Sequence, residues 1–211
     1  MTILEILFQV AELLSAILAT IFFKKYNKTV IKWMLPYLWY VVLNETLSYF
    51  LVIKRGLLQY ELVNLYLLIT VLFVLFLISN RVRLSKHKAI LHFIAIVFTM
   101  GVAIEWVVKG IGVSWQFSEF IGALSVIIGT CIYGISLFIN DDLSNPIKNL
   151  FTYIMLGFTT YFIAGPIIFI AIYLYSDNYD LIISLKYLLY GTIILMYSIF
   201  SFGFIYSDKE E

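Results

Sequence analysis

The chain has 211 residues and a formal net charge of +1; 63% of its residues are hydrophobic and only 13% are charged. A typical soluble domain is about 45–50% apolar and about 25% charged, so this composition excludes an ordinary soluble globular domain. The near-neutral charge argues against nucleic-acid binding, and the single Cys131 excludes an intramolecular disulfide and a multi-cysteine metal site. The sequence therefore predicts an integral membrane protein whose main partner is the lipid bilayer.

Seven apolar runs, each bounded by charged or turn-forming residues, follow one another along the chain. A helix needs about 20 such residues to cross a hydrocarbon core of about 30 Å. Because the runs lack the apolar–polar alternation of barrel strands, we predict an all-α, polytopic transmembrane helix bundle that forms a single domain, 1–211. The predicted spans are 2–23, 30–53, 57–79, 89–108, 113–139, 150–175 and 181–206.

The first span is predicted to be a retained anchor. No basic residue precedes its apolar run, whereas Lys24, Lys25 and Lys28 follow it. A secretory signal peptide has the opposite arrangement, with basic residues ahead of the apolar run.

The distribution of lysine and arginine predicts the orientation, since cytoplasmic loops retain these residues. One side of the predicted bundle holds Lys24, Lys25, Lys28, Lys32, Arg81, Arg83, Lys86, Lys88, Lys148 and Lys209. The other side holds only Lys54, Arg55 and Lys109, and Lys186 lies within the seventh span. This asymmetry predicts an N-terminus outside and a C-terminus inside, in a cell membrane that we expect to be a bacterial inner membrane.

Small residues and prolines indicate how the spans pack. Gly122 and Gly129 in the fifth span and Gly157 in the sixth belong to stripes of small residues at helical spacing, which let helix backbones approach closely. Pro36 and Pro166 are candidates for kinks in the second and sixth spans. With Glu12, which lies near the middle of the membrane in the predicted orientation, these residues form the predicted structural or coupling set: Glu12, Pro36, Gly122, Gly129, Gly157 and Pro166.

Charged residues inside the spans are the most informative feature of the sequence. Five glutamates and one lysine lie within the predicted spans: Glu12, Glu45, Glu61, Glu105, Glu119 and Lys186. A charge at a helix centre costs about 2.5–3.5 kcal/mol on insertion scales, so such side chains face protein or water. In the predicted orientation all lie in the outer half, except Glu12 near the middle.

Polar neighbours extend these positions into stripes along the helices. Asn44 precedes Glu45 in the second span, and Glu61 and Asn64 share a helix face in the third. In the seventh span Lys186 begins a stripe that continues through Tyr190, Tyr197 and Ser201. The sequence thus predicts an outward-opening polar cavity with these ligand-binding residues: Asn44, Glu45, Glu61, Asn64, Glu105, Glu119, Lys186 and Tyr190.

A purely structural interpretation stands beside the cavity. In it, Glu61, Glu105 and Glu119 reach water at the outer interface, while Glu45 and Glu12 pair with Lys186 or with tyrosine hydroxyls. The cavity is favoured because one lysine does not neutralise five carboxylates, so the excess is protonated, hydrated or matched by a cation.

The sequence argues against the common catalytic chemistries. A zinc hydrolase in a helix bundle recruits about three histidines, whereas this chain has only His87 and His92. No Gly-x-Ser-x-Gly motif and no phosphate-binding loop is found. Lys186 lies too near the outer end for the Schiff base of a retinal protein. No catalytic residue, metal site or cofactor is predicted, and the protein is expected not to be an enzyme.

Three strings resemble those of a loose group of uncharacterised bacterial integral membrane proteins of about this length with roughly seven spans. They are 40–50 with its central Glu45, Asn64-Leu65-Tyr66, and 151–169 with Tyr161 and Gly165. The resemblance implies a multi-pass membrane fold and no activity. By analogy with small multi-span proteins of this kind, a sensor kinase is a candidate signalling partner.

These features favour a sensor or receptor-like module whose cavity binds a small cationic ligand or responds to protons. The runner-up is a transporter of small solutes or one coupled to protons, which needs the same cavity to open alternately to both sides. A membrane enzyme and a structural partner subunit are the remaining alternatives.

Overall fold

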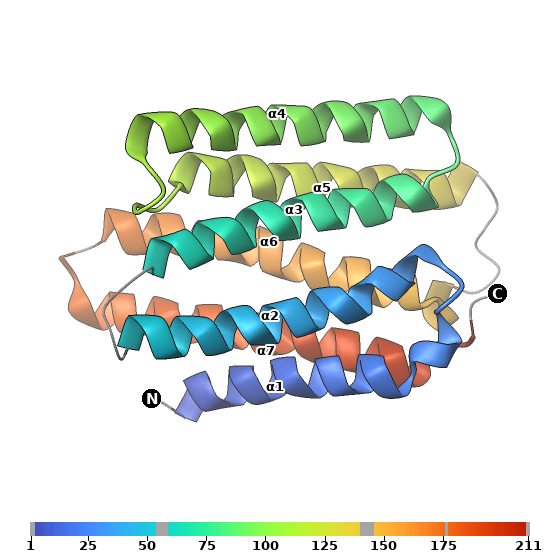
Figure 1. Ribbon diagram of the computed structural model, residues 1–211, viewed down its shortest axis with the longest axis horizontal. Helices are drawn as coiled ribbons and strands as arrows, with labels where there is room; N and C mark the ends of the chain where they lie inside the picture. Colours follow the sequence, from blue (N-terminus) through green and yellow to red (C-terminus); the bar gives the residue numbers. More distant parts are fainter. Residues whose placement is uncertain (1–2, 54–58, 140–145, 176, 210–211) are drawn as a thin grey trace. The chain divides into compact units, whose positions relative to one another are not determined.

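The computed structural model describes residues 3–53, 59–139, 146–175 and 177–209. The predicted all-α class is confirmed, because the elements of the described residues are all helical. These ranges hold the following α-helices (Figure 1): α1 (Ile3–Ile21), α2 (Met34–Ser48), α3 (Gln59–Arg81), α4 (Ser85–Lys109), α5 (Gln116–Ile139), α6 (Leu150–Leu174) and α7 (Tyr179–Tyr206). Each overlaps one predicted span closely.

Six of the described helices are long and apolar enough to cross a membrane, namely α1, α3, α4, α5, α6 and α7. The second predicted span is not confirmed as a seventh. There the regular α-helix has only 15 residues, because after Ser48 the chain continues as a π-helical segment, Tyr49–Ile53, of 5 residues. A helix of this combined length would reach about the thickness of a hydrocarbon core.

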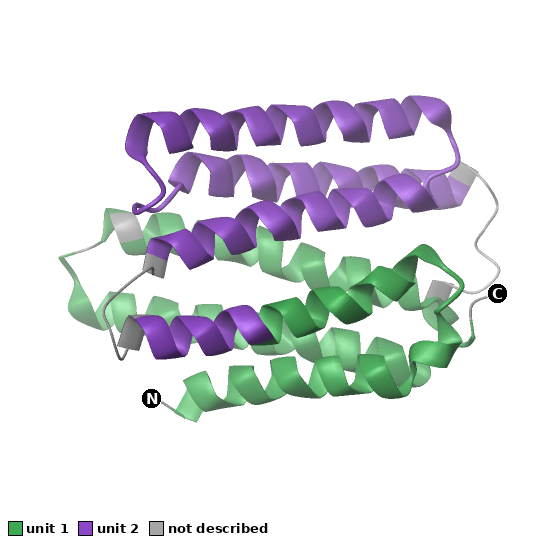
Figure 2. Cartoon of the chain, in the orientation of Figure 1, with its two compact units in different colours: residues 1–42, 145–211 green, residues 43–144 purple. Residues whose placement is uncertain are grey.

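The chain forms two compact units, shown in green and purple in Figure 2. Unit 1 comprises Met1–Val42 and Asn145–Glu211, and therefore contains α1, the first part of α2, α6 and α7. Unit 2 comprises Leu43–Ser144 and contains the end of α2 together with α3, α4 and α5. The single domain predicted from the sequence stays a prediction.

In unit 1, α7 packs against both α6 and α1. A Cβ atom added to Gly157 of α6 would lie 2.5 Å from Cε1 of Phe200 and 3.1 Å from the Met196 carbonyl oxygen. At Gly203 of α7, an added Cβ would lie 2.6 Å from Cβ of Tyr153. The two helices thus approach closely because each presents a glycine to the other.

The helices α1 and α7 run parallel. The Tyr190 hydroxyl of α7 donates to Glu5 of α1, and two turns further along both helices the Tyr197 hydroxyl donates to Glu12. Figure 1 shows the two helices side by side with their amino ends together. This shared direction bears on the number of membrane crossings.

The segment after α1 fastens the carboxyl ends of α1 and α7. Tyr26 is fully buried, and its hydroxyl donates to the Ala19 carbonyl at 2.6 Å. The Lys25 ammonium donates to the carbonyls of Ile205 (2.9 Å) and Ser207 (2.8 Å), which the last turn of a helix otherwise leaves without partners. Burial raises the pKa of the Tyr26 phenol above its ordinary 10.0 and lowers the pKa of Lys25.

In unit 2, helices α3, α4 and α5 pack against one another in pairs. A Cβ atom added to Gly122 would lie 2.9 Å from Cγ2 of Val71 and 3.1 Å from Cε2 of Phe98. Two turns further along α5, a Cβ added to Gly129 would lie 3.0 Å from Cδ1 of Ile78. The small residues of the fifth predicted span therefore lie where α5 meets α3 and α4.

The two prolines occupy different places in their helices. Pro36 lies in the first turn of α2, where a proline removes no internal hydrogen bond, and it is exposed. Pro166 lies inside α6 and is buried, and the helix continues through it to Leu174.

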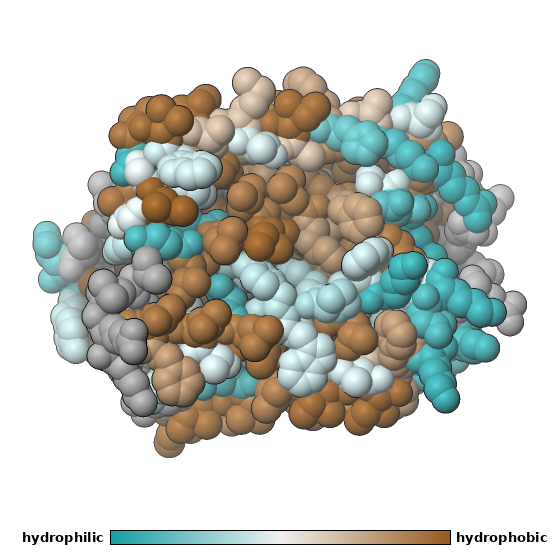
Figure 3. All heavy atoms as spheres, viewed as in Figure 1, coloured by the Kyte–Doolittle hydropathy of each residue, from teal (hydrophilic) through white to brown (hydrophobic). Residues whose placement is uncertain are grey.

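Large apolar side chains remain exposed along the helices. On α4 they include Phe93, Ile96, Met100 and Ile104. Figure 3 shows apolar surface over the middle of the helices in view and hydrophilic surface gathering toward their ends. A surface of this kind is compatible with a protein embedded in lipid.

Candidate functional site

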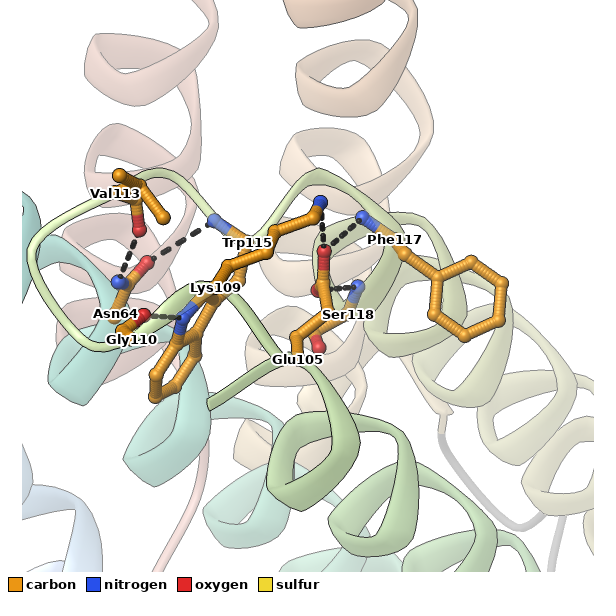
Figure 4. Close-up of polar contacts among 8 residues, drawn as sticks. All are labelled: Asn64, Glu105, Lys109, Gly110, Val113, Trp115, Phe117 and Ser118. Atoms are coloured by element: carbon orange, nitrogen blue, oxygen red, sulfur yellow. Dashed lines mark hydrogen bonds and ion pairs between the residues drawn. The ribbon is translucent and has the colours of Figure 1, made fainter. Parts of the chain in front are cut away.

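Glu105, near the end of α4, holds the start of α5 (Figure 4). Its Oε2 accepts a hydrogen bond from the Ser118 amide at 2.7 Å, and its Oε1 accepts a longer one, 3.4 Å, from the Phe117 amide. The Lys109 ammonium lies 2.7 Å from Oε1, one turn along α4. The first amides of a helix lack partners within it and carry partial positive charge, so a carboxylate is well suited to this position.

Asn64 of α3 clamps the loop between α4 and α5. Its amide nitrogen donates to the carbonyls of Ile111 (3.0 Å) and Val113 (2.8 Å), while its amide oxygen accepts from the Trp115 amide at 3.4 Å. The Trp115 indole closes the same loop by donating to the Gly110 carbonyl at 3.0 Å (Figure 4). Asn64 is 2% exposed, so these bonds satisfy an amide that is removed from solvent.

Two further carboxyl groups adjoin this loop. Glu119 directly follows Ser118 in the first turn of α5 and is half-buried. Glu61, in the first turn of α3, lies beside the loop, because Oε1 of Glu61 is 3.5 Å from the position of a Cβ on Gly112. We call Glu61, Glu105 and Glu119 the acidic group of unit 2.

Unit 2 is basic at the opposite end of its helices. Arg81 closes α3, and Lys86 and Lys88 lie in the first turns of α4. The acidic group lies at the start of α3, the end of α4 and the start of α5. The acidic group is thus separated from these three basic residues by the length of the helices, while Lys109 lies at the acidic end beside Glu105.

Unit 1 has its own polar line, between α1 and α7. Tyr190 stacks on Phe8, with ring centroids 5.3 Å apart, and its hydroxyl lies 3.3 Å from Oε1 of Glu5. The Tyr197 hydroxyl lies 3.5 Å from Oε1 of Glu12, which is 2% exposed. We call this line of contacts, from Glu5 to Tyr197, the polar seam.

The predicted ligand-binding residues are therefore divided between the two units. Glu61, Asn64, Glu105 and Glu119 come together around the loop in unit 2, whereas Tyr190 belongs to the polar seam of unit 1. The remaining predicted residues lie elsewhere along the chain. Asn44 is buried and Glu45 half-buried on the part of α2 that belongs to unit 2, and Lys186 is exposed on α7 in unit 1. One shared cavity for all of them stays a prediction.

Sequence reasoning missed several residues of these places. The Glu105–Lys109 pair is visible as carboxylate and ammonium four residues apart on one helix. The role of Glu105 at the start of α5 depends on how two helices meet, and sequence spacing does not record that. Glu5 and Ser15 of α1 were not among the predicted site residues.

Within the described part of the chain, no group of three His, Cys, Asp or Glu side chains is arranged to hold a metal ion.

The structure is compatible with the class of multi-pass α-helical membrane proteins, because it has long apolar helices, exposed apolar surface and polar groups at the helix ends. No family model, curated protein or solved structure matches this chain.

Proposed function

We propose that the chain crosses the membrane seven times, with its N-terminus outside and its C-terminus inside. Parallel α1 and α7 support this topology, because helices that cross in the same direction are separated by an odd number of crossings. Six spans without α2 would make α1 and α7 antiparallel. Lysines at the carboxyl end of α1, at 24, 25 and 28, fit a cytoplasmic position for that end of unit 1.

Within this topology, the protein is a sensor or receptor-like module of the bacterial inner membrane that binds protons or a small cation at the acidic group of unit 2. The observation that carries this function is the pairing of charges at the start of α5. Glu105 has Lys109 as its ionic partner, whereas Glu119 has no ion pair or hydrogen bond from its side chain to the described residues. Of these two neighbouring carboxyl groups, only one thus has a lysine as its ion-pair partner.

The negative charge of the carboxyl group that has no lysine partner must be compensated in another way. A negative charge at a helix end inside the bilayer is stable only with a proton, water or a cation beside it. Lys109 is already committed to Glu105 at 2.7 Å and is 44% exposed. Glu119 is therefore the residue that gains or loses a proton or a cation, and Glu61, beside the loop at Gly112, is a second acceptor.

Binding at Glu119 has a route to the rest of unit 2. Glu119 lies in the first turn of α5, which Glu105 holds to α4 and whose preceding loop Asn64 holds to α3. Neutralising Glu119 changes the repulsion between two carboxyl groups on different helices, and so biases how α4 and α5 meet. A membrane-embedded signalling partner such as a sensor kinase would read that change.

The test uses purified protein in lipid nanodiscs and measures its thermal unfolding temperature, Tm. For the wild type we expect Tm to change between about pH 5 and about pH 9, and to rise with tetramethylammonium or ammonium chloride relative to sodium chloride at equal ionic strength. Glu119→Gln carries a permanently neutral side chain, so its Tm should change less with pH and with these cations than the Tm of the wild type. Glu105→Gln loses the ion pair with Lys109 and one of the two oxygens that accept from the first amides of α5, and should lower Tm under every condition.

Glu211→Gln is the matched control, because it removes a carboxylate outside the spans and should behave as the wild type. Equal responses of wild type and Glu119→Gln to pH and to both cations would refute the sensor proposal.

A transporter is the second candidate, and the polar seam is the observation that favours it. Carboxyl and hydroxyl groups follow one another along α1 and α7 from Glu5 to Tyr197, which is how proton and ion pathways are lined. Proteoliposomes loaded with a pH-sensitive dye would show proton flux coupled to an imposed solute gradient. A dye signal no faster than that of protein-free liposomes would leave sensing as the function.

A further inference from the structure

At the Glu12–Tyr197 contact of the polar seam, unit 1 has four oxygen-bearing side chains within about one helical turn. Glu12 and Ser15 lie one turn apart on α1, and both are buried. Tyr197 and Ser201 lie one turn apart on the neighbouring α7, and both are buried as well. Because Tyr197 contacts Glu12 in a parallel helix pair, Ser201 lies within about one residue of the level of Ser15, a rise of about 1.5 Å.

Both serines face the neighbouring helix. Ser15 lies between Glu12 and Ala19, and the Ala19 carbonyl accepts the Tyr26 hydroxyl where the Tyr26 ring meets Phe204 of α7. On α7, Ser201 lies between Tyr197, which contacts Glu12, and that same Phe204. The residues before and after each serine on its helix face thus belong to the contact between α1 and α7.

The serine hydroxyls find no protein partner. Among the described residues, neither Oγ of Ser15 nor Oγ of Ser201 has a hydrogen-bond partner, although Ser15 is 0% and Ser201 9% exposed. Serines inside helices ordinarily donate to the carbonyl one turn back, as Ser198 does to Ile194 at 2.7 Å. Buried hydroxyls without partners are rare and costly, so two at one level indicate a bound species that they ligate.

We propose that Glu12, Ser15, Tyr197 and Ser201 bind a monovalent cation, a proton or a sodium ion, between α1 and α7. Carboxylate and hydroxyl oxygens are the ligands that hard cations prefer, and a cation removes the cost of an acidic side chain at this depth. The other titratable groups along the contact between α1 and α7 are Glu5 and Tyr190, two turns toward the amino ends, and Tyr26 and Lys25 at the carboxyl ends. No basic side chain of α1 or α7 lies between them.

The site joins two helices that are far apart in the sequence. Two of its ligands come from α1 and two from α7, so an occupied site fastens these helices to each other. The site lies wholly in unit 1 and uses no residue of the acidic group of unit 2. It stands or falls independently of the proposed sensor function.

The experiment measures Tm of the full chain in nanodiscs, in sodium chloride and in N-methyl-D-glucamine chloride at equal ionic strength, across about pH 5 to about pH 9. A sodium site predicts that Tm of the wild type rises by about 3 °C in sodium chloride at neutral pH. A proton site predicts no difference between the two salts and a Tm that depends on pH. The Tm of Glu12→Gln should change less with sodium or with pH than the Tm of the wild type.

Ser15→Ala and Ser201→Ala keep the carboxyl group and test the proposal even where Glu12→Gln does not fold. If these hydroxyls ligate a cation, each substitution should lower Tm and weaken the sodium or pH response. If they are merely unpartnered, removing them should leave Tm unchanged or raise it, since an unsatisfied buried group is lost.

Ser198→Ala is the matched control on α7, because Ser198 is exposed and its hydroxyl already has a partner. Serine variants with unchanged or raised Tm would overturn the proposal. So would a Glu12→Gln variant that retains the sodium and pH responses of the wild type.

Discussion

At the scale of single residues, some polar side chains of this protein hold the fold together through hydrogen bonds, and others have no such structural role. Asn64 and Glu105 were both predicted as ligand-binding residues, and their hydrogen bonds hold a loop and a helix start. Their polarity and their location inside spans were readable from the sequence. Their partners are backbone groups of another segment, which become neighbours only when the helices pack, so the sequence alone did not distinguish these roles.

Tyr26 provides a test at this scale. Tyr26→Phe removes the hydroxyl that donates to Ala19, and leaves a buried carbonyl without that partner; we expect a loss of about 1 kcal/mol in the free energy of unfolding near neutral pH. Because burial raises the pKa of this phenol, its contribution is complete below pH 10.0 and is lost as the pH rises above that value.

The measurement is chemical unfolding in detergent, followed by tryptophan fluorescence at neutral and alkaline pH. Tyr26→Phe should fall below the wild type at neutral pH, and the gap should narrow above pH 10.0. A gap that stays constant or widens with pH would show that the phenol does not stabilise the fold in its neutral form.

At the scale of elements, the sequence predicted the existence of the helices better than their pairing. Apolar length bounded by charge marks a helix directly, which is why α1 and α3 to α7 overlap their predicted spans. The end of α2 was not predictable in this way, since a π-helical segment has the same apolar composition as an α-helix. The polar stripe from Lys186 to Ser201 was visible in the sequence. The side chains of α1 that it contacts could be identified only from the structure, which shows that α1 and α7 run parallel.

Gly157 tests the packing of α6 on α7. Gly157→Ala introduces a Cβ that meets both the Phe200 ring and the Met196 backbone, and we expect it to cost about 1–3 kcal/mol. Gly191→Ala in α7 is the matched control, because nothing lies within 4 Å of its Cβ position. There alanine should be neutral or should stabilise the helix by about 0.5–1 kcal/mol.

Unfolding in mixed micelles titrated with a denaturing detergent measures both variants. Equal effects of the two substitutions would show that the contact at Gly157 does not determine how α6 and α7 pack.

At the scale of the whole molecule, the account depends on how often the chain crosses the bilayer. The sequence predicted seven spans from apolar length and an orientation from the distribution of lysine and arginine. The parallel direction of α1 and α7 supports seven crossings, and this direction cannot be read from the amino-acid composition. The acidic group of unit 2 and the polar seam of unit 1 acquire a depth in the membrane only through that topology.

Labelling of single cysteines in spheroplasts tests this topology directly. In a background with Cys131→Ser, the variants Ile3→Cys and Lys209→Cys place a thiol at an exposed position at each end of the chain. Seven crossings predict that a membrane-impermeant maleimide labels Ile3→Cys in intact spheroplasts and Lys209→Cys only after permeabilisation. Labelling of both positions from the same side would contradict the seven-span account.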